Sequence, residues 1–95
     1  MYKIERKFFQ SEKPTWILQV LLALNPTTFE KTDSIAHARE NLKSIGDVLQ
    51  HTRCNHYGKF KPLLTIRNII QSDNSITVTS FGNKKYMAFN IVELR

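Results

Sequence analysis

The stretch Ser34–Gln50, SIAHARENLKSIGDVLQ, decides the fold of this chain. Its apolar residues recur every three or four positions, which lines them up along one face of an α-helix. They are Ile35, Ala38, Leu42, Ile45, Val48 and Leu49. Thr32, Asp33 and Ser34 are all residue types that cap a helix N-terminus. Because a helix with one apolar stripe needs a surface to pack on, the pattern predicts a helix lying across a second layer. Gly46 marks either close packing or a break into two helices.

The segments that flank this helix are typical of β-strands. Tyr2–Phe8 alternates apolar and polar residues, which predicts a half-buried strand with Arg6 at an edge or strand end. After the helix come three apolar or β-branched segments separated by the turn-forming sequences QSDNS and GNKK. These segments are Leu63–Ile70, Ile76–Phe81 and Tyr86–Leu94. Together they predict a three-stranded antiparallel meander.

Thr15–Leu24, TWILQVLLAL, is the ambiguous segment, because it is nearly all apolar and periodicity cannot separate a buried strand from a buried helix. Its Trp, Ile and Val residues and the neighbouring strand favour a strand, and we predict a central strand that pairs with the first. His51–Pro62 is expected to be irregular, because it contains Gly58 and ends in a proline.

These elements predict a single α+β domain over residues 1–95. Its length of 95 residues and hydrophobic content of 41% fit one globular domain. The expected architecture is an antiparallel sheet of about five strands in the order ββαβββ, with one amphipathic helix packed on one face. A winged-helix arrangement is the alternative if Gly46 splits the helix.

The composition favours a cytoplasmic protein. A single cysteine, Cys54, excludes an internal disulfide and suits a reducing compartment. The apolar run Trp16–Leu24 has the length of a signal-peptide core, but Glu5 and Glu12 precede it and no small-residue cleavage site follows. The same run is too short for a membrane-spanning helix, which needs about 20 apolar residues.

Positive charge is distributed unevenly along the chain. The formal net charge is +6, and residues 51–67 hold four cations and no acidic residue. Residues 27–50, which include the predicted helix, hold three cations and four acidic residues. A concentrated basic segment indicates a polyanionic partner, either nucleic acid or an acidic protein surface.

Cations and aromatic rings interleave in this basic segment. Cations neutralise phosphates, while rings stack on unpaired bases. The sequence therefore predicts a small nucleic-acid-binding module, with RNA favoured over DNA. The residues expected to make the contacts are Arg53, His56, Tyr57, Lys59, Lys61 and Arg67, joined by Lys84 and Lys85 in the last turn.

No catalytic or cofactor signature is present, which favours a binding protein over an enzyme. His51, Cys54 and His56 are metal-ligand types, but their spacing matches no common zinc module and a fourth ligand is missing. We therefore predict no metal site and no cofactor. Cys54 lacks the orienting group and oxyanion donors that a cysteine nucleophile needs.

Two other functions fit the same sequence. A strand, helical material and a basic meander resemble the layout of RelE-like bacterial toxins, in element order and charge. That resemblance implies metal-independent RNA cleavage, with Lys59, Lys61, Arg67 and Tyr86 as the first candidates, and it requires Thr15–Leu24 to be helical. The other alternative is a small phage-type accessory protein that binds and inhibits a host protein through a sheet edge or the polar face of the helix. The oligomeric state is left open.

Overall fold

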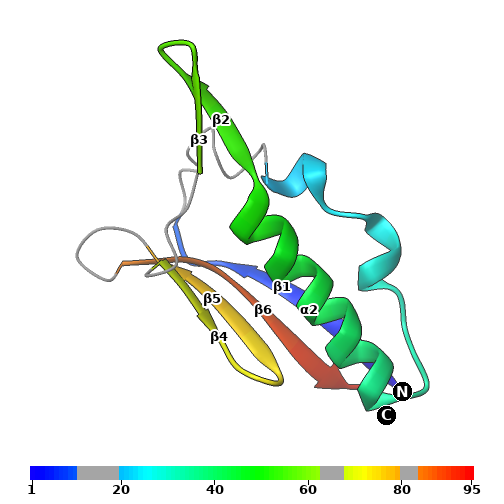
Figure 1. Cartoon of the computed structure of the whole chain (residues 1–95). Coiled ribbons are helices and arrows are strands. Elements are labelled where there is room, and N and C mark those ends of the chain that lie inside the picture. Colours follow the sequence, from blue (N-terminus) through cyan, green and yellow to red (C-terminus); the bar gives the residue numbers. More distant parts are fainter. Residues whose placement is uncertain (11–19, 63–67, 80–83) are drawn as a thin grey trace.

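The computed structural model of the chain describes residues 1–10, 20–62, 68–79 and 84–95, with the backbone alone at residues 54–56 and 60–62. A short helical turn covers residues 20–23. The other elements are β1 (Tyr2–Phe8), η1 (Pro26–Phe29, a 3-10 helix), α2 (Ile35–His51), β2 (Arg53–His56), β3 (Lys59–Pro62), β4 (Ile69–Gln71), β5 (Ser75–Thr79) and β6 (Lys85–Glu93). The predicted α+β class is confirmed (Figure 1).

The main sheet has four antiparallel strands in the order β1-β6-β5-β4. Strands β4, β5 and β6 form the predicted meander, with β4 beginning at Ile69. Residues 63–67 and 80–81, which the prediction also assigned to its strands, lie outside the described residues. The N-terminal strand β1 pairs with the C-terminal strand β6 along its whole length, from Tyr2 opposite Glu93 to Phe8 opposite Met87. This pairing places β1 at an edge of the sheet.

Arg6 accounts for the break in the alternation of β1. Its guanidinium carbon lies 4.7 Å from the centre of the Phe29 ring, so the cation packs on an aromatic face beside the edge strand. Phe29 in turn lies 6.1 Å from Phe89, which is fully buried. Arg6 is itself exposed, so the apolar side of β1 accommodates this cation at the sheet edge, with its guanidinium group over the η1 ring.

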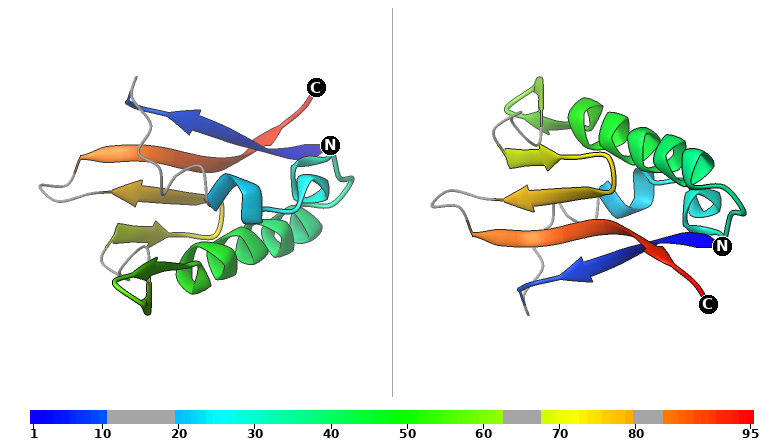
Figure 2. Two further views of the ribbon diagram at one scale, coloured as in Figure 1. Left: turned by 90° about the horizontal axis from the view of Figure 1, so that it is seen from above. Right: turned by 90° about the horizontal axis from the view of Figure 1, so that it is seen from below.

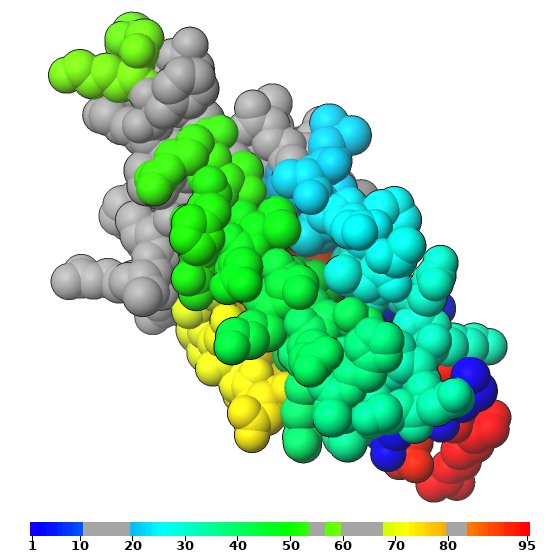
Figure 3. All heavy atoms as spheres, turned by 45° about the vertical axis from the view of Figure 1, so that its right-hand side comes forward, coloured from blue at the N-terminus to red at the C-terminus, as the bar shows by residue number. Residues whose placement is uncertain are grey.

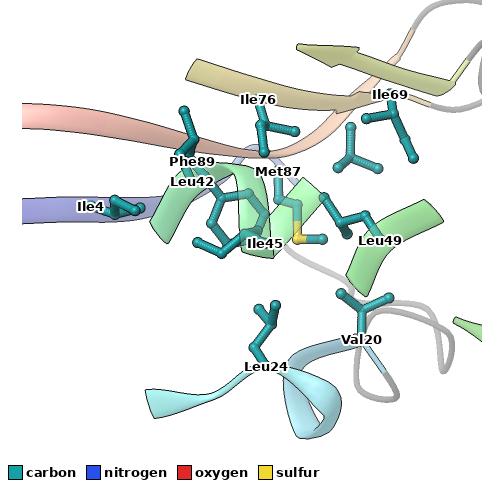
Figure 4. Close-up of a cluster of buried hydrophobic side chains, with 11 residues drawn as sticks. Ile4, Val20, Leu24, Leu42, Ile45, Leu49, Ile69, Ile76, Met87 and Phe89 are labelled. Carbon is teal, nitrogen blue, oxygen red and sulfur yellow. The ribbon is translucent and has the colours of Figure 1, made fainter. Parts of the chain in front are cut away.

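Helix α2 packs across one face of this sheet and contacts all four strands (Figure 2). Ser34 is the N-cap, and its hydroxyl accepts a hydrogen bond from the His37 backbone N–H. The predicted stripe faces the core, where Leu42, Ile45 and Leu49 are each 1% exposed or less. They meet the alternating inward residues of the strands, which are Ile4, Ile69, Ile76, Val78, Met87 and Phe89 (Figure 4).

The helix is continuous through Gly46, which is buried. A Cβ at this position would lie 2.6 Å from Oε1 of Gln71 on β4, so the glycine marks a close approach between helix and sheet. The winged-helix alternative required a break at Gly46, and the unbroken helix excludes it.

The strand predicted at Thr15–Leu24 is wrong in its described part. Residues 20–23 are helical, and residues 15–19 lie outside the described residues. Val20 and Leu24 still enter the core, at 0% and 6% exposure, but from a segment outside the sheet (Figure 4). Strand β1, which was expected to pair with this segment, pairs with β6 instead. The main sheet therefore has four described strands and not five.

The irregular segment predicted at His51–Pro62 is also wrong. It forms an antiparallel hairpin, β2–β3, which makes a separate two-stranded sheet. Gly58, taken as a sign of irregularity, sits instead in the hairpin turn with φ of 80°. Among the residues that the structure describes, no helix has the length and apolar character needed to cross a membrane.

The contact between Gly46 and Gln71 makes a first prediction. Alanine is favoured over glycine inside a helix by about 1 kcal/mol, but the new methyl group would displace the exposed end of Gln71. We expect G46A to raise the free energy of unfolding by about 1 kcal/mol in a Q71A background, and by less in the wild type. Urea unfolding of the wild type, G46A, Q71A and the double variant measures the coupling between positions 46 and 71. Equal effects of G46A in both backgrounds would contradict the assigned contact.

Candidate nucleic-acid interface

The β2–β3 hairpin is a direct extension of helix α2. Thr52 caps the helix, its backbone N–H donating to the Val48 carbonyl, and β2 begins at the next residue. The hairpin projects from the helix end, away from the two chain termini (Figure 1). Its tip at residues 57–59 stands out from the molecular surface (Figure 3), and the molecule measures 47 × 24 × 21 Å.

The turn of this hairpin has two residues in left-handed backbone conformations. Tyr57 has φ of 52° and Gly58 has φ of 80°. Two successive positive φ values define the type I′ turn, whose twist matches that of the flanking strands and which favours Asn-Gly or Gly-Gly. Gly58 meets that requirement without strain, but a left-handed tyrosine costs roughly 1–2 kcal/mol. Tyr57 therefore occupies a position that its own backbone preference opposes.

Two described cations, Arg53 and Lys59, lie on the strands that flank this tyrosine. The Tyr57 side chain is 94% exposed, and Arg53 and Lys59 are also exposed. The strand register places Lys59 opposite His56 and Lys61 opposite Cys54. The structure does not describe the side chains of Cys54, His56 and Lys61, and Arg67 lies outside the described residues.

The other two predicted site residues lie at the start of β6. Lys84 and Lys85 are both exposed. Both this segment and the β2–β3 hairpin lie away from the two termini, but the hairpin projects from the end of α2, apart from the start of β6 (Figure 1). The two basic segments therefore form separate patches.

The sequence analysis missed an aromatic residue close to the start of β6. Phe9, directly after β1, is 41% exposed, and the ammonium nitrogens of Lys7 and Lys85 lie 5.2 and 5.8 Å from the centre of its ring. The Phe9 backbone N–H donates to the Tyr86 carbonyl at 2.9 Å. The spacing of Lys7 and Phe9 in the sequence could have indicated a shared face. The approach of Lys85 could not be foreseen without the pairing of β1 with β6.

Of the residues implied by the toxin-like layout, the side chain of Lys61 and the whole of Arg67 lie outside the described residues. Lys59 is exposed in the hairpin, whereas Tyr86 is half-buried against the core of the main sheet. The described residues hold no group of three or more His, Cys, Asp and Glu side chains placed to bind a metal ion. The helical state of residues 20–23 is the one that this layout requires.

Comparison with known proteins leaves the site to be argued from its own geometry. The chain matches no protein-family model, no curated protein and no solved structure.

The turn geometry makes a second prediction. Asparagine tolerates the left-handed conformation better than tyrosine, so Y57N should raise the stability of the hairpin by up to about 1 kcal/mol. G58A should lower it by about 1 kcal/mol, because alanine is strained at a φ of 80°. Hydrogen exchange of the β2 and β3 amides measures both changes. Faster exchange in Y57N than in the wild type would contradict the assigned turn.

Proposed function

We propose that the protein binds single-stranded nucleic acid, with RNA favoured, through the β2–β3 hairpin. The observation that carries this proposal is Tyr57, a tyrosine that is 94% exposed at a left-handed turn position. Its conformation costs stability, and so exposed a ring adds little to the core. A residue that opposes the local backbone preference in this way fits a role in binding better than one in folding.

The ring and its neighbours suit an unpaired base and its phosphates. Aromatic side chains stack on bases of any sequence, which is worth about 1–3 kcal/mol for each base. Arg53 and Lys59 place positive charge on the two strands below the ring. Stacking requires a base that is not already paired, which is why a single strand is favoured over a duplex.

The charge distribution supports the same ligand class. Residues 51–67 carry four cations without an acidic residue, within a chain of net charge +6. Neutralising phosphates with these cations releases counterions, so affinity should fall steeply with salt. Helix α2, where acidic and basic residues nearly balance, belongs to the scaffold in this proposal.

Binding to fluorescent RNA and DNA oligonucleotides, followed by anisotropy at several salt concentrations, tests the proposal. We expect binding to single strands to exceed binding to duplexes, and Y57N to weaken it roughly 5- to 150-fold while Y57F largely preserves it. K59Q should lower the salt slope by about 1. K31Q is the control. It removes one positive charge, as K59Q does, but next to the backbone bridge between Thr32 and Tyr2 and not in the hairpin.

Y57N is expected to raise the stability of the hairpin and to lower its affinity for nucleic acid, so this variant separates an effect on binding from an effect on folding. A variant with a more stable hairpin and weaker binding would show that the ring contacts the ligand. Unchanged affinity in Y57N and K59Q would refute the hairpin as the binding site. Shortened RNA on a denaturing gel would instead identify a nuclease.

A second candidate function is binding of a protein segment along the β1 edge. On its outer side, within the described part of the chain, only Thr32 pairs with β1, at Tyr2. Alternation directs the backbone groups of Ile4 and Arg6 to the same side, where a groove of about 340 Å³ is lined by Lys3, Ile4, Glu5, Arg6 and Phe29. Such an edge can accept an extended strand. A stoichiometric protein partner retained after nuclease treatment, and lost in R6P, would favour this function.

A further inference from the structure

The main sheet has a second face that α2 does not cover. Seen from that side, no described helix lies over the strands (Figure 2). Side chains alternate along β1, so Lys3, Glu5 and Lys7 lie on this open face while Ile4 enters the core. Phe9 lies two residues after Lys7, just beyond the end of β1, and continues this alternation.

A β-bulge brings a second cation to Phe9. Val78 pairs with Met87, but Thr79 pairs with Lys85, so β6 carries one additional residue at this point. Regular alternation would place Lys85 on the same face as Met87, which is buried in the core. The shift in register instead lets the Lys85 ammonium group approach the Phe9 ring, at 5.8 Å from its centre. Bulges commonly re-aim side chains next to functional sites.

The position of the ring is fixed from both strands. The Phe9 N–H donates to the Tyr86 carbonyl at 2.9 Å, and Nε2 of Gln10 donates to the Lys85 carbonyl at 3.3 Å. The ring is nevertheless 41% exposed, which leaves part of its surface accessible. We call Phe9, Lys7 and Lys85 the Phe9 patch.

Packing alone accounts poorly for this arrangement. Contacts between an ammonium group and an exposed ring are weak, yet two ammonium groups approach this one ring. Among the described residues, no carboxylate pairs with Lys7 or Lys85; Glu12 lies outside them. Two cations without a described carboxylate partner would attract an anionic ligand, and the ring offers an aromatic surface beside them.

We propose that the Phe9 patch is a second nucleotide-binding site. A base stacks on the exposed part of Phe9, and the phosphates on either side of it lie against Lys7 and Lys85. The inference rests on the proposed function, since the same nucleic-acid strand would also contact the β2–β3 hairpin. The inference adds that the bound nucleic-acid strand continues from the hairpin onto the open face of the sheet.

Substitutions at the patch test this site with a uridine oligonucleotide of about ten nucleotides. F9L keeps an apolar side chain but removes the aromatic surface, and we expect it to lower affinity roughly 5- to 150-fold, while F9W restores binding. K7Q and K85Q should each lower the salt slope by about 1. K3Q, on the same face of the same strand, is the matched control and should have a smaller effect.

Three outcomes distinguish the two proposals. Weaker binding in F9L, K7Q and K85Q, with unchanged thermal unfolding, would support the second site. Loss of binding in Y57N and K59Q, but not in any patch variant, would overturn the second site and leave the hairpin proposal intact. Absence of binding by the wild-type protein would overturn both. Because K7Q and K85Q alter exposed side chains, they keep the test valid if F9L fails to fold.

Discussion

The packing of helix α2 on the sheet is the interaction on which the rest of the structure depends. Leu42, Ile45 and Leu49 form one side of the core, and Met87 and Phe89 of β6 form much of the other, all almost fully buried. Burying such side chains stabilises the fold by about 1.5–3 kcal/mol each. In the sheet that receives them, the N-terminal strand β1 pairs with the C-terminal strand β6. The helix therefore packs on segments from both ends of the chain.

This core also sets where the exposed elements lie. A helix anchored along its whole stripe has a fixed end, and β2 follows that end after a single capping residue, Thr52. Tyr57 is thereby carried outward on a short hairpin rather than on a loop. At the start of β6, the β1–β6 pairing and the bulge bring Lys85 to Phe9. Acidic and basic residues nearly balance in α2, whereas residues 51–67 carry four cations and no acidic residue.

Much of the fold follows from local patterns. The three- and four-residue spacing in α2, the alternation in β1 and the turn sequences of the meander were sufficient to predict those elements. Residues 20–23 were assigned wrongly because an uninterrupted apolar run carries no period that separates a buried helix from a buried strand. The β2–β3 hairpin was missed because the first turn position holds tyrosine, where asparagine or glycine would have indicated a type I′ turn.

The candidate site was only partly predictable for a different reason. Tyr57 and Lys59 stood out because charge and rings are adjacent in the sequence. Phe9 did not, since its relation to Lys85 depends on the pairing of the two ends of the chain and on a register shift. Local composition reveals a basic segment, but the surface formed by distant segments requires the topology.

Titration of the isotopically labelled protein with single-stranded RNA, monitored by amide chemical shifts, tests the central claim most directly. The account predicts that the largest changes fall in β2, β3 and the turn at Tyr57, at the end of the molecule away from the termini. Amides near the bridge of Tyr2 to Thr32 should remain unchanged. Changes centred on the outer edge of β1, or no saturable change at all, would contradict it.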